Sequence, residues 1–140
     1  MASNFRCSIV TPSEAVFDDE ATYVSFPAWD GQHGVIGGAS PLLTRLGVGS
    51  LRIDAPEGGS RWYLIDGGFA QVAEGQLSIV TEYAEPAEQL AGQDFSGELE
   101  EASKMVHDTS VDREMAEHQL NRALAKKSLV AAMEQRGRAI

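Results

Sequence analysis

The side chains in this sequence that could perform chemistry are three histidines, a short acidic run and one cysteine. His33, His107 and His118 lie at spacings that match no metal-binding motif. The acidic run, residues 18–20, lacks the alternating ligands of a calcium-binding loop, so we expect it at a strand edge or in a turn. An active site needs a nucleophile with a base, paired carboxylates or a metal, and no such set is recognisable. We therefore expect no catalytic residue and no metal ligand.

Cys7 is the only cysteine, so the chain forms no internal disulfide, and a reducing compartment is the simpler expectation. It alternates with Phe5 and Ile9, which predicts that it points into a core as a small apolar side chain. The glycine-rich residues 34–38 lack the lysine of a phosphate-binding loop, and no helical pattern follows them. These patterns favour a protein that acts through surfaces rather than through an active site.

The 140 residues carry a net charge of −10, which argues against binding to the phosphate backbone of a nucleic acid. The first 14 residues lack the basic start and apolar run of a signal peptide. No segment has the length and apolarity needed to cross a bilayer. We expect a soluble protein that meets a membrane only through partners.

The elements that must carry such surfaces differ between the two parts of the chain. Up to residue 83 the sequence shows short alternating segments separated by turn signals, which predicts an antiparallel β-sandwich or barrel. No crossover helix fits between these segments, so a parallel α/β fold is disfavoured. The expected strands include residues 5–9, 23–26, 51–53, 62–65, 69–72 and 77–80.

After Pro86 good helix formers dominate, and apolar residues recur at helical spacing. A polar break at residues 107–110 separates two helices, and Thr109 or Ser110 is expected to cap the second. The sequence thus predicts a β-sandwich in residues 1–86 and an antiparallel helical hairpin in residues 87–140. The expected apolar stripes are Leu99, Ala102 and Val106 on the first helix, and Leu120, Ala123, Leu124, Ala131 and Met133 on the second.

The stripes are narrow and partly alanine, and Gly92 and Gly97 weaken the start of the first helix, so we expect a marginally stable hairpin. Charge is also unevenly distributed. Residues 121–140 hold five basic side chains and one acidic one, a net +4 that leaves −14 for the rest. Because Arg122, Lys126 and Lys127 lie mid-helix, stabilisation of a helix end explains them poorly. They predict contact with an acidic partner surface.

Residues 26–44 read FPAWDGQHGVIGGASPLLT, with a Gly-x-x-Gly pair, a small-residue turn and a Pro-Leu-Leu-Thr end. Further matches follow in order at residues 63–72 (YLIDGGFAQV) and 77–81 (LSIVT). With these segments the chain resembles the epsilon subunits of rotary (F-type) ATP synthases over essentially its whole length.

The resemblance implies a non-catalytic central-stalk subunit that couples the membrane ring to a gamma-type shaft. It also implies a hairpin that restrains ATP hydrolysis at the catalytic head. The implied partners are the shaft, ring and head subunits, at the cytoplasmic face of an energy-transducing, bacterial membrane. The implied partner-binding residues are Asp30, Gly31, Gln32 and His33 toward the ring, Ala39, Ser40, Pro41 and Leu42 near the shaft, and Arg122, Lys126 and Lys127 toward the head.

Two departures from the family pattern have consequences. Ala39 stands where the family usually has a histidine, which should alter local packing at the shaft contact. Ala91 and Asp94 stand where members that bind a regulatory ATP carry an aspartate and an arginine. A carboxylate in place of a guanidinium repels a triphosphate, so no cofactor is expected.

Two other functions remain open from the residues alone. The chain could be a stand-alone β-sandwich adaptor whose basic helical tail recruits an acidic protein. It could also be a sandwich that binds a small ligand, which would require a convergent polar pocket.

Overall fold

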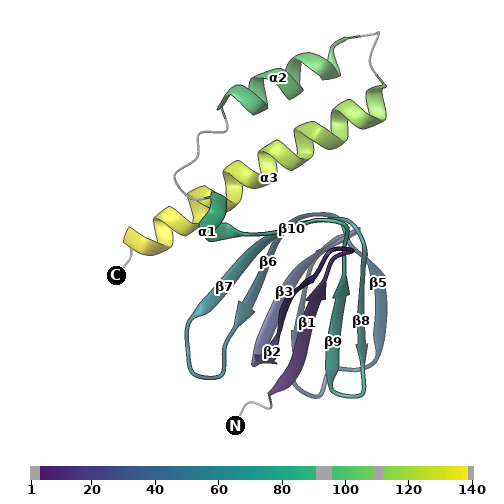
Figure 1. Cartoon of the computed structure of the whole chain (residues 1–140), viewed down its shortest axis with the longest axis vertical. Helices are drawn as coiled ribbons and strands as arrows, with labels where there is room; N and C mark the ends of the chain where they lie inside the picture. The colour runs from purple at the N-terminus through teal and green to yellow at the C-terminus, as the bar shows by residue number, and fades with distance from the viewer. Residues whose placement is uncertain (1–3, 91–95, 109–111, 139–140) are drawn as a thin grey trace. The chain divides into compact units, whose positions relative to one another are not determined.

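The computed structural model describes residues 4–90, 96–108 and 112–138, without the side chains of residues 96 and 133–138. Its contacts divide the chain into two compact units, Met1–Pro86 and Ala87–Ile140 (Figure 1). The first unit contains the strands and the second the helices.

The first unit is a sandwich of two five-stranded sheets. One sheet, here called sheet A, has the order β2-β1-β9-β8-β5. Its strands are β1 (Phe5–Val10), β2 (Ala15–Ala21), β5 (Leu42–Arg45), β8 (Phe69–Ala73) and β9 (Gln76–Val80). Sheet B has the order β10-β7-β6-β3-β4. Its strands are β3 (Tyr23–Ala28), β4 (Gly31–Ile36), β6 (Val48–Asp54), β7 (Ser60–Asp66) and β10 (Ala84–Pro86).

The predicted β-sandwich is confirmed, with one difference in strand pairing. Among the strands of the described chain, β1 and β9 pair in parallel and every other pair is antiparallel. Parallel pairing needs no hairpin between the partners, and β1 and β9 lie far apart in the sequence. The acidic residues 18–20 lie on the edge strand β2, where charge discourages pairing with another chain.

The core between the sheets follows from the alternation of apolar residues along the strands. Cys7 and Ile9 of β1 are fully buried, as the sequence predicts, together with Leu77 and Ile79 of the parallel neighbour β9. Sheet B contributes a facing set of buried side chains: Val24, Phe26, Leu51, Ile53, Tyr63 and Ile65. Burial of these side chains stabilises the unit by roughly 1.5–3 kcal/mol for each large apolar residue.

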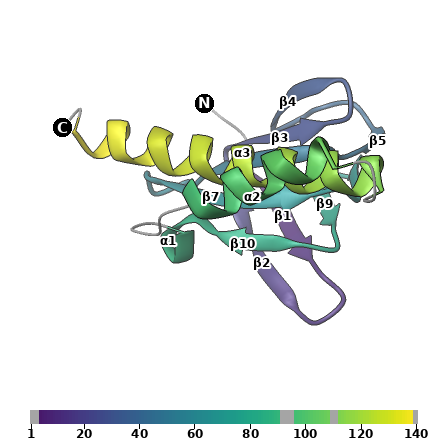
Figure 2. The same cartoon turned by 90° about the horizontal axis from the view of Figure 1, so that it is seen from above.

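The second unit contains α1 (Ala87–Leu90), α2 (Ser96–Val106) and α3 (Arg113–Arg138). Two views show α2 and α3 side by side, as the hairpin prediction requires, and α1 also contacts α3 (Figures 1 and 2). The cap of α3 is Asp112, whose Oδ1 accepts a hydrogen bond from the backbone N–H of Glu114 at 3.0 Å. The predicted caps, Thr109 and Ser110, lie outside the described residues.

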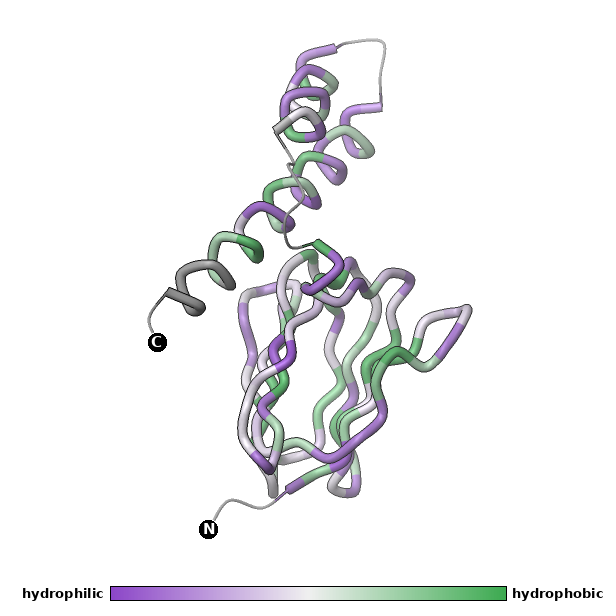
Figure 3. Tube along the Cα trace, turned by 60° about the vertical axis from the view of Figure 1, so that its left-hand side comes forward, coloured by the Kyte–Doolittle hydropathy of each residue, from purple (hydrophilic) through white to green (hydrophobic). Residues whose placement is uncertain are grey.

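The apolar stripe of α3 differs in part from the predicted one. Ala123 is buried and Leu120 half-buried, but Leu124 and Ala131 are exposed. The buried residues of the described part of α3 are Ala116, Ala123 and Leu129. Hydrophilic and hydrophobic residues alternate closely along both long helices (Figure 3). Alanine occurs on several faces of α3, so its position says little about which face is buried. Within the described chain, no helix combines the length and apolarity required to span a membrane.

Candidate partner-binding surfaces

The β3–β4 hairpin carries the first group of predicted site residues, at a tight turn where Ala28 pairs with Gly31. Gly31 has a φ of 135°, a conformation that favours glycine. Beside the turn, the His33 ring stacks on Phe26 with 5.8 Å between ring centroids, and its Nε2 lies 3.2 Å from Asp30 Oδ1. These contacts hold Asp30 and His33 together at one end of the sandwich.

Gln32, in the same hairpin, is fixed by sheet B. Its Nε2 donates hydrogen bonds to Ser25 Oγ at 2.9 Å and to the Ser50 carbonyl oxygen at 3.0 Å. The indole of Trp29 projects from the turn with 69% of its surface exposed, while its backbone N–H donates to the Arg45 carbonyl. An ordered turn with an exposed indole is suited to a partner contact, since tryptophan is enriched at binding hot spots.

The second predicted group, Ala39, Ser40, Pro41 and Leu42, follows β4 and leads into β5. All four residues are exposed, and the Ala39 N–H donates to the Ile36 carbonyl across a turn. The six residues of β4 separate this group from Asp30, a span of roughly 17 Å at strand geometry. Asp30 thus precedes β4 and the second group follows it, whereas Gly31, Gln32 and His33 form the first half of β4 itself.

A further exposed surface was not predicted. Val10, Phe69 and Val80 lie next to one another across β1, β9 and β8, because Val80 pairs with both of the others. Leu43 on β5 lies two residues before Arg45, the partner of Phe69. All four side chains are between 39% and 68% exposed. We call Val10, Leu43, Phe69 and Val80 the outer apolar surface. Strand alternation could have indicated it, because Ala70, Val72, Leu77 and Ile79 point inward and their neighbours must point outward.

The outer apolar surface includes a groove of about 550 Å³. Val10, Pro12, Phe69 and Val80 contribute to its lining, which is mainly apolar. Exposed apolar side chains that are grouped in this way mark interaction sites more often than isolated ones do.

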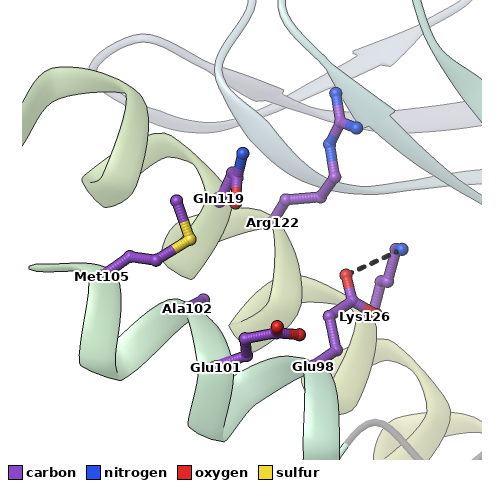
Figure 4. A pocket seen from close by; sticks show the side chains of 7 residues that line it. All are labelled: Glu98, Glu101, Ala102, Met105, Gln119, Arg122 and Lys126. Carbon is purple, nitrogen blue, oxygen red and sulfur yellow. Dashed lines mark hydrogen bonds and ion pairs between the residues drawn. The ribbon is translucent and has the colours of Figure 1, made fainter. Parts of the chain in front are cut away.

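The third predicted group lies on α3. Arg122 and Lys126 line a space between α2 and α3, whereas Lys127 is exposed on the same helix (Figure 4). Lys126 Nζ lies 3.1 Å from Oε1 of Glu98 on α2. We call Arg122, Lys126 and Lys127 the basic face. Lys126 of the basic face therefore already forms an ion pair inside the hairpin.

Two further charged or nucleophilic groups have perturbed pKa values. Burial raises the pKa of the Cys7 thiol to about 12. A hydrogen bond of 2.8 Å from Arg6 Nε to Asp18 Oδ1 lowers the pKa of the exposed Asp18 carboxyl. A neutral, buried thiol is a poor nucleophile, so Cys7 is a core residue. Across the described ranges, no three His, Cys, Asp or Glu side chains are grouped to hold a metal ion. Ala91 and Asp94, on which the prediction about ATP depends, lie outside the described residues.

Taken together, these features define a small β-sandwich protein with a helical hairpin and several exposed surfaces. The family described as ATP synthase, Delta/Epsilon chain, beta-sandwich domain matches residues 4–87. An ATP synthase epsilon chain of Rhodopirellula baltica is 36% identical over 120 residues, which cover 86% of this chain and 93% of the relative. The chain belongs to the ATP synthase epsilon chain family. Epsilon chains are non-catalytic subunits, and the catalytic sites lie on other subunits of the synthase.

Two solved structures share the fold. One chain in the OSCP/F1/c-ring part of the Euglena gracilis mitochondrial ATP synthase has a TM-score of 0.82 and 23% identity, covering 91% of this chain and 82% of that chain. A chain from the central stalk/c-ring of the Tetrahymena thermophila mitochondrial ATP synthase has a TM-score of 0.63 and 10% identity, covering 89% and 95%. At these identities the likeness concerns the fold.

Proposed function

We propose that this chain is a central-stalk subunit of a proton-translocating ATP synthase, in which the sandwich joins the shaft to the membrane ring. Membership of the epsilon chain family supports this role, as does the structural neighbour from the central stalk/c-ring of the Tetrahymena thermophila synthase. The chain would then lie at the cytoplasmic face of a bacterial membrane, attached through its partners.

The shaft contact is proposed for Ala39, Ser40, Pro41 and Leu42 together with the outer apolar surface. One observation carries this assignment: the predicted shaft stretch runs directly into β5, which pairs with β8, and so continues through Leu43 to Phe69. A continuous apolar area is favourable for a lasting contact, because its burial contributes about 25 cal/mol per Å².

The ring contact is proposed for Asp30, Gly31, Gln32 and His33, with Trp29 between β3 and β4 as an additional exposed group. Because β4 separates this turn from the shaft stretch, one rigid sandwich can reach two partners at once. Such a bridge would transmit torque from the ring to the shaft.

The hairpin is proposed as a two-state element that restrains ATP hydrolysis when its basic face meets an acidic surface of the catalytic head. The described contacts of the hairpin support a low stability: alanines supply several of its buried positions, and Met115 and Leu124 are exposed. A closed and an open form that differ by a few kcal/mol could be interchanged by partner binding.

Co-purification with the shaft subunit tests the coupling role, and a chain truncated after Pro86 tests the regulatory one. Truncation after Pro86 preserves β10, which pairs with β7 through Pro86 and Tyr63. We expect the truncated chain to bind the shaft subunit as the full chain does, and the assembled head to hydrolyse ATP faster with it. If the full chain did not bind the shaft subunit, the coupling role would be contradicted. An unchanged hydrolysis rate would contradict the restraint alone.

A further inference from the structure

A charged groove of about 400 Å³ lies between α2 and α3 of the helical hairpin. Two carboxylates of α2, Glu98 and Glu101, and two cations of α3, Arg122 and Lys126, contribute to its lining (Figure 4). Opposite charges thus face each other across the helix pair. Glu98 and Lys126 form an ion pair of 3.1 Å although 28 residues separate them in the sequence.

The Glu98–Lys126 pair differs in its surroundings from the other ion pairs described in the hairpin. Its lysine side chain is 16% exposed and its glutamate 44% exposed, whereas the lysine of the pair between Lys104 and Glu100 is 76% exposed. That second pair joins residues four apart on one helix, so it does not connect α2 to α3. A half-shielded pair that joins two helices therefore contributes more to their contact than an exposed pair within one helix, which contributes little.

We propose that Glu98 competes with the acidic partner surface for Lys126, so that the closed hairpin withholds part of its own basic face. This inference rests on the proposed function, which assigns Arg122, Lys126 and Lys127 to an acidic surface. Lys127 is exposed in the closed hairpin, whereas Lys126 is paired with Glu98. A partner carboxylate that takes up Lys126 competes with Glu98 for the same ammonium group, and displacement of Glu98 loosens α2 from α3.

The partner implied by this competition is a polypeptide segment rich in carboxylates. It would supply to Lys126 the same group that Glu98 supplies in the closed form. Opening of the hairpin and binding of the acidic segment are therefore linked, and each favours the other. High salt should weaken both contacts, because ions screen exposed charges.

The test compares Glu98→Gln with Glu100→Gln in the full chain. Both variants remove one negative charge from α2, but the second removes it from the exposed intrahelical pair. The binding probe is an oligo-glutamate peptide. Opening is followed by the separation of labels attached to Ser103→Cys and Ser128→Cys, two exposed positions, while the buried Cys7 remains unlabelled.

We expect Glu98→Gln to widen the label separation and to bind the peptide about fivefold more tightly. A gain of this size corresponds to the loss of one partly exposed ion pair that competes with the peptide. Glu100→Gln should leave the label separation unchanged and alter peptide binding by less than about twofold. Equal peptide binding by the two variants would overturn the competition.

A second variant covers the case in which Glu98→Gln unfolds the helices, which circular dichroism would reveal. The combined change of Glu98→Lys and Lys126→Glu keeps an ion pair across the groove with its charges reversed. We expect it to retain the native label separation and to bind the peptide more weakly than the native chain. Tighter binding would overturn the proposal.

Binding to the purified catalytic head, measured in parallel, separates this inference from the proposed function. If no variant binds the head while Glu98→Gln alone gains affinity for the peptide, the competition stands and the role at the head is lost. If the head binds every variant and peptide binding does not respond to Glu98, the role stands and the competition is lost.

Discussion

Gly68 and Val80 approach each other so closely that a Cβ atom on Gly68 would collide with the Val80 carbonyl oxygen and lie 2.8 Å from the Thr81 Cα. Their contact lies where the chain leaves β7 in sheet B and enters β8 in sheet A. The Thr81 hydroxyl strengthens this crossing by donating a hydrogen bond of 2.6 Å to the Gly67 carbonyl. Because the crossing leads directly to Phe69, it also positions the outer apolar surface.

Replacing Gly68 with alanine should destabilise the sandwich by roughly 3 kcal/mol, since it adds a steric clash to backbone strain. The φ of Gly68 is 108°, where a side chain is disfavoured. The control is Gly58→Ala, because Gly58 has a φ of 100° but no atom within 4 Å of the place that a Cβ would occupy. We expect the control to lose about 1 kcal/mol in urea unfolding. Equal losses would show that the clash is relieved by a shift of the backbone.

The Cys7 thiol should be unreactive in the folded chain and reactive once the sandwich opens. Its pKa of about 12, raised from 9.0, means that the native chain holds almost no thiolate at neutral pH. Above pH 9 the unfolded chain loses this proton while the folded chain keeps it, so stability should fall between about pH 9 and 12. A thiol reagent measures the reactivity in buffer and in urea, with Ser103→Cys as the exposed control. Fast modification of Cys7 in buffer would contradict its place in the core.

The exposed pair of Arg6 and Asp18 should be visible as a lowered carboxyl pKa rather than as a large gain in stability. The pKa of Asp18 lies below its ordinary value of 3.8 because Arg6 donates a hydrogen bond to the carboxylate. The stabilisation is therefore present above pH 3.8 and is lost as the pH falls through the folded pKa. NMR titration of Asp18 in the native chain and in Arg6→Gln measures the shift. An unchanged pKa in the variant would contradict the pairing.

Alternation of apolar residues predicted the strands that supply the core but not all of those at the sheet edges. The segment from Phe5 to Ile9 was recognisable because its buried positions recur every second residue. By contrast, β4 reads GQHGVI and has few side chains that favour strands. It forms because the tight turn at Gly31 pairs it with β3, and because Gly34 leaves room for the Tyr23 ring. Such a cause lies in another strand and cannot be read from the segment itself.

The candidate site was predictable only where a resemblance or a charge pattern indicated it. The basic face followed from the charges of α3, but the pairing of Lys126 with Glu98 depends on the relative phase of two helices. That phase is set by buried alanines, whose small side chains occur on several faces and give a weak periodic signal. Leu124 illustrates the consequence: its spacing fitted the predicted stripe, yet its side chain is exposed.

The buried Leu129 and the exposed Leu124 on α3 provide a direct test of how the hairpin packs. Leu129 is 2% exposed and Leu124 is 47% exposed, so replacing each with alanine removes the same atoms from different surroundings. We expect Leu129→Ala to destabilise the hairpin by roughly 2–4 kcal/mol and Leu124→Ala by less than about 0.5 kcal/mol. Hydrogen exchange of the α2 and α3 amides measures the local opening. Equal protection in the two variants would contradict the described packing of α3.

The outer apolar surface is tested by replacing Phe69 with serine. Because Phe69 is 53% exposed, the sandwich should keep its fold while binding to the shaft subunit weakens by at least about tenfold, as expected for an aromatic hot spot. Trp29→Ser is the matched control, since the Trp29 indole is 69% exposed but belongs to the proposed ring contact. It should leave shaft binding intact and weaken association with the membrane ring instead. Calorimetry with each purified partner measures both effects. If the two variants lost affinity for the same partner, the assignment of Phe69 to the shaft and of Trp29 to the ring would be wrong.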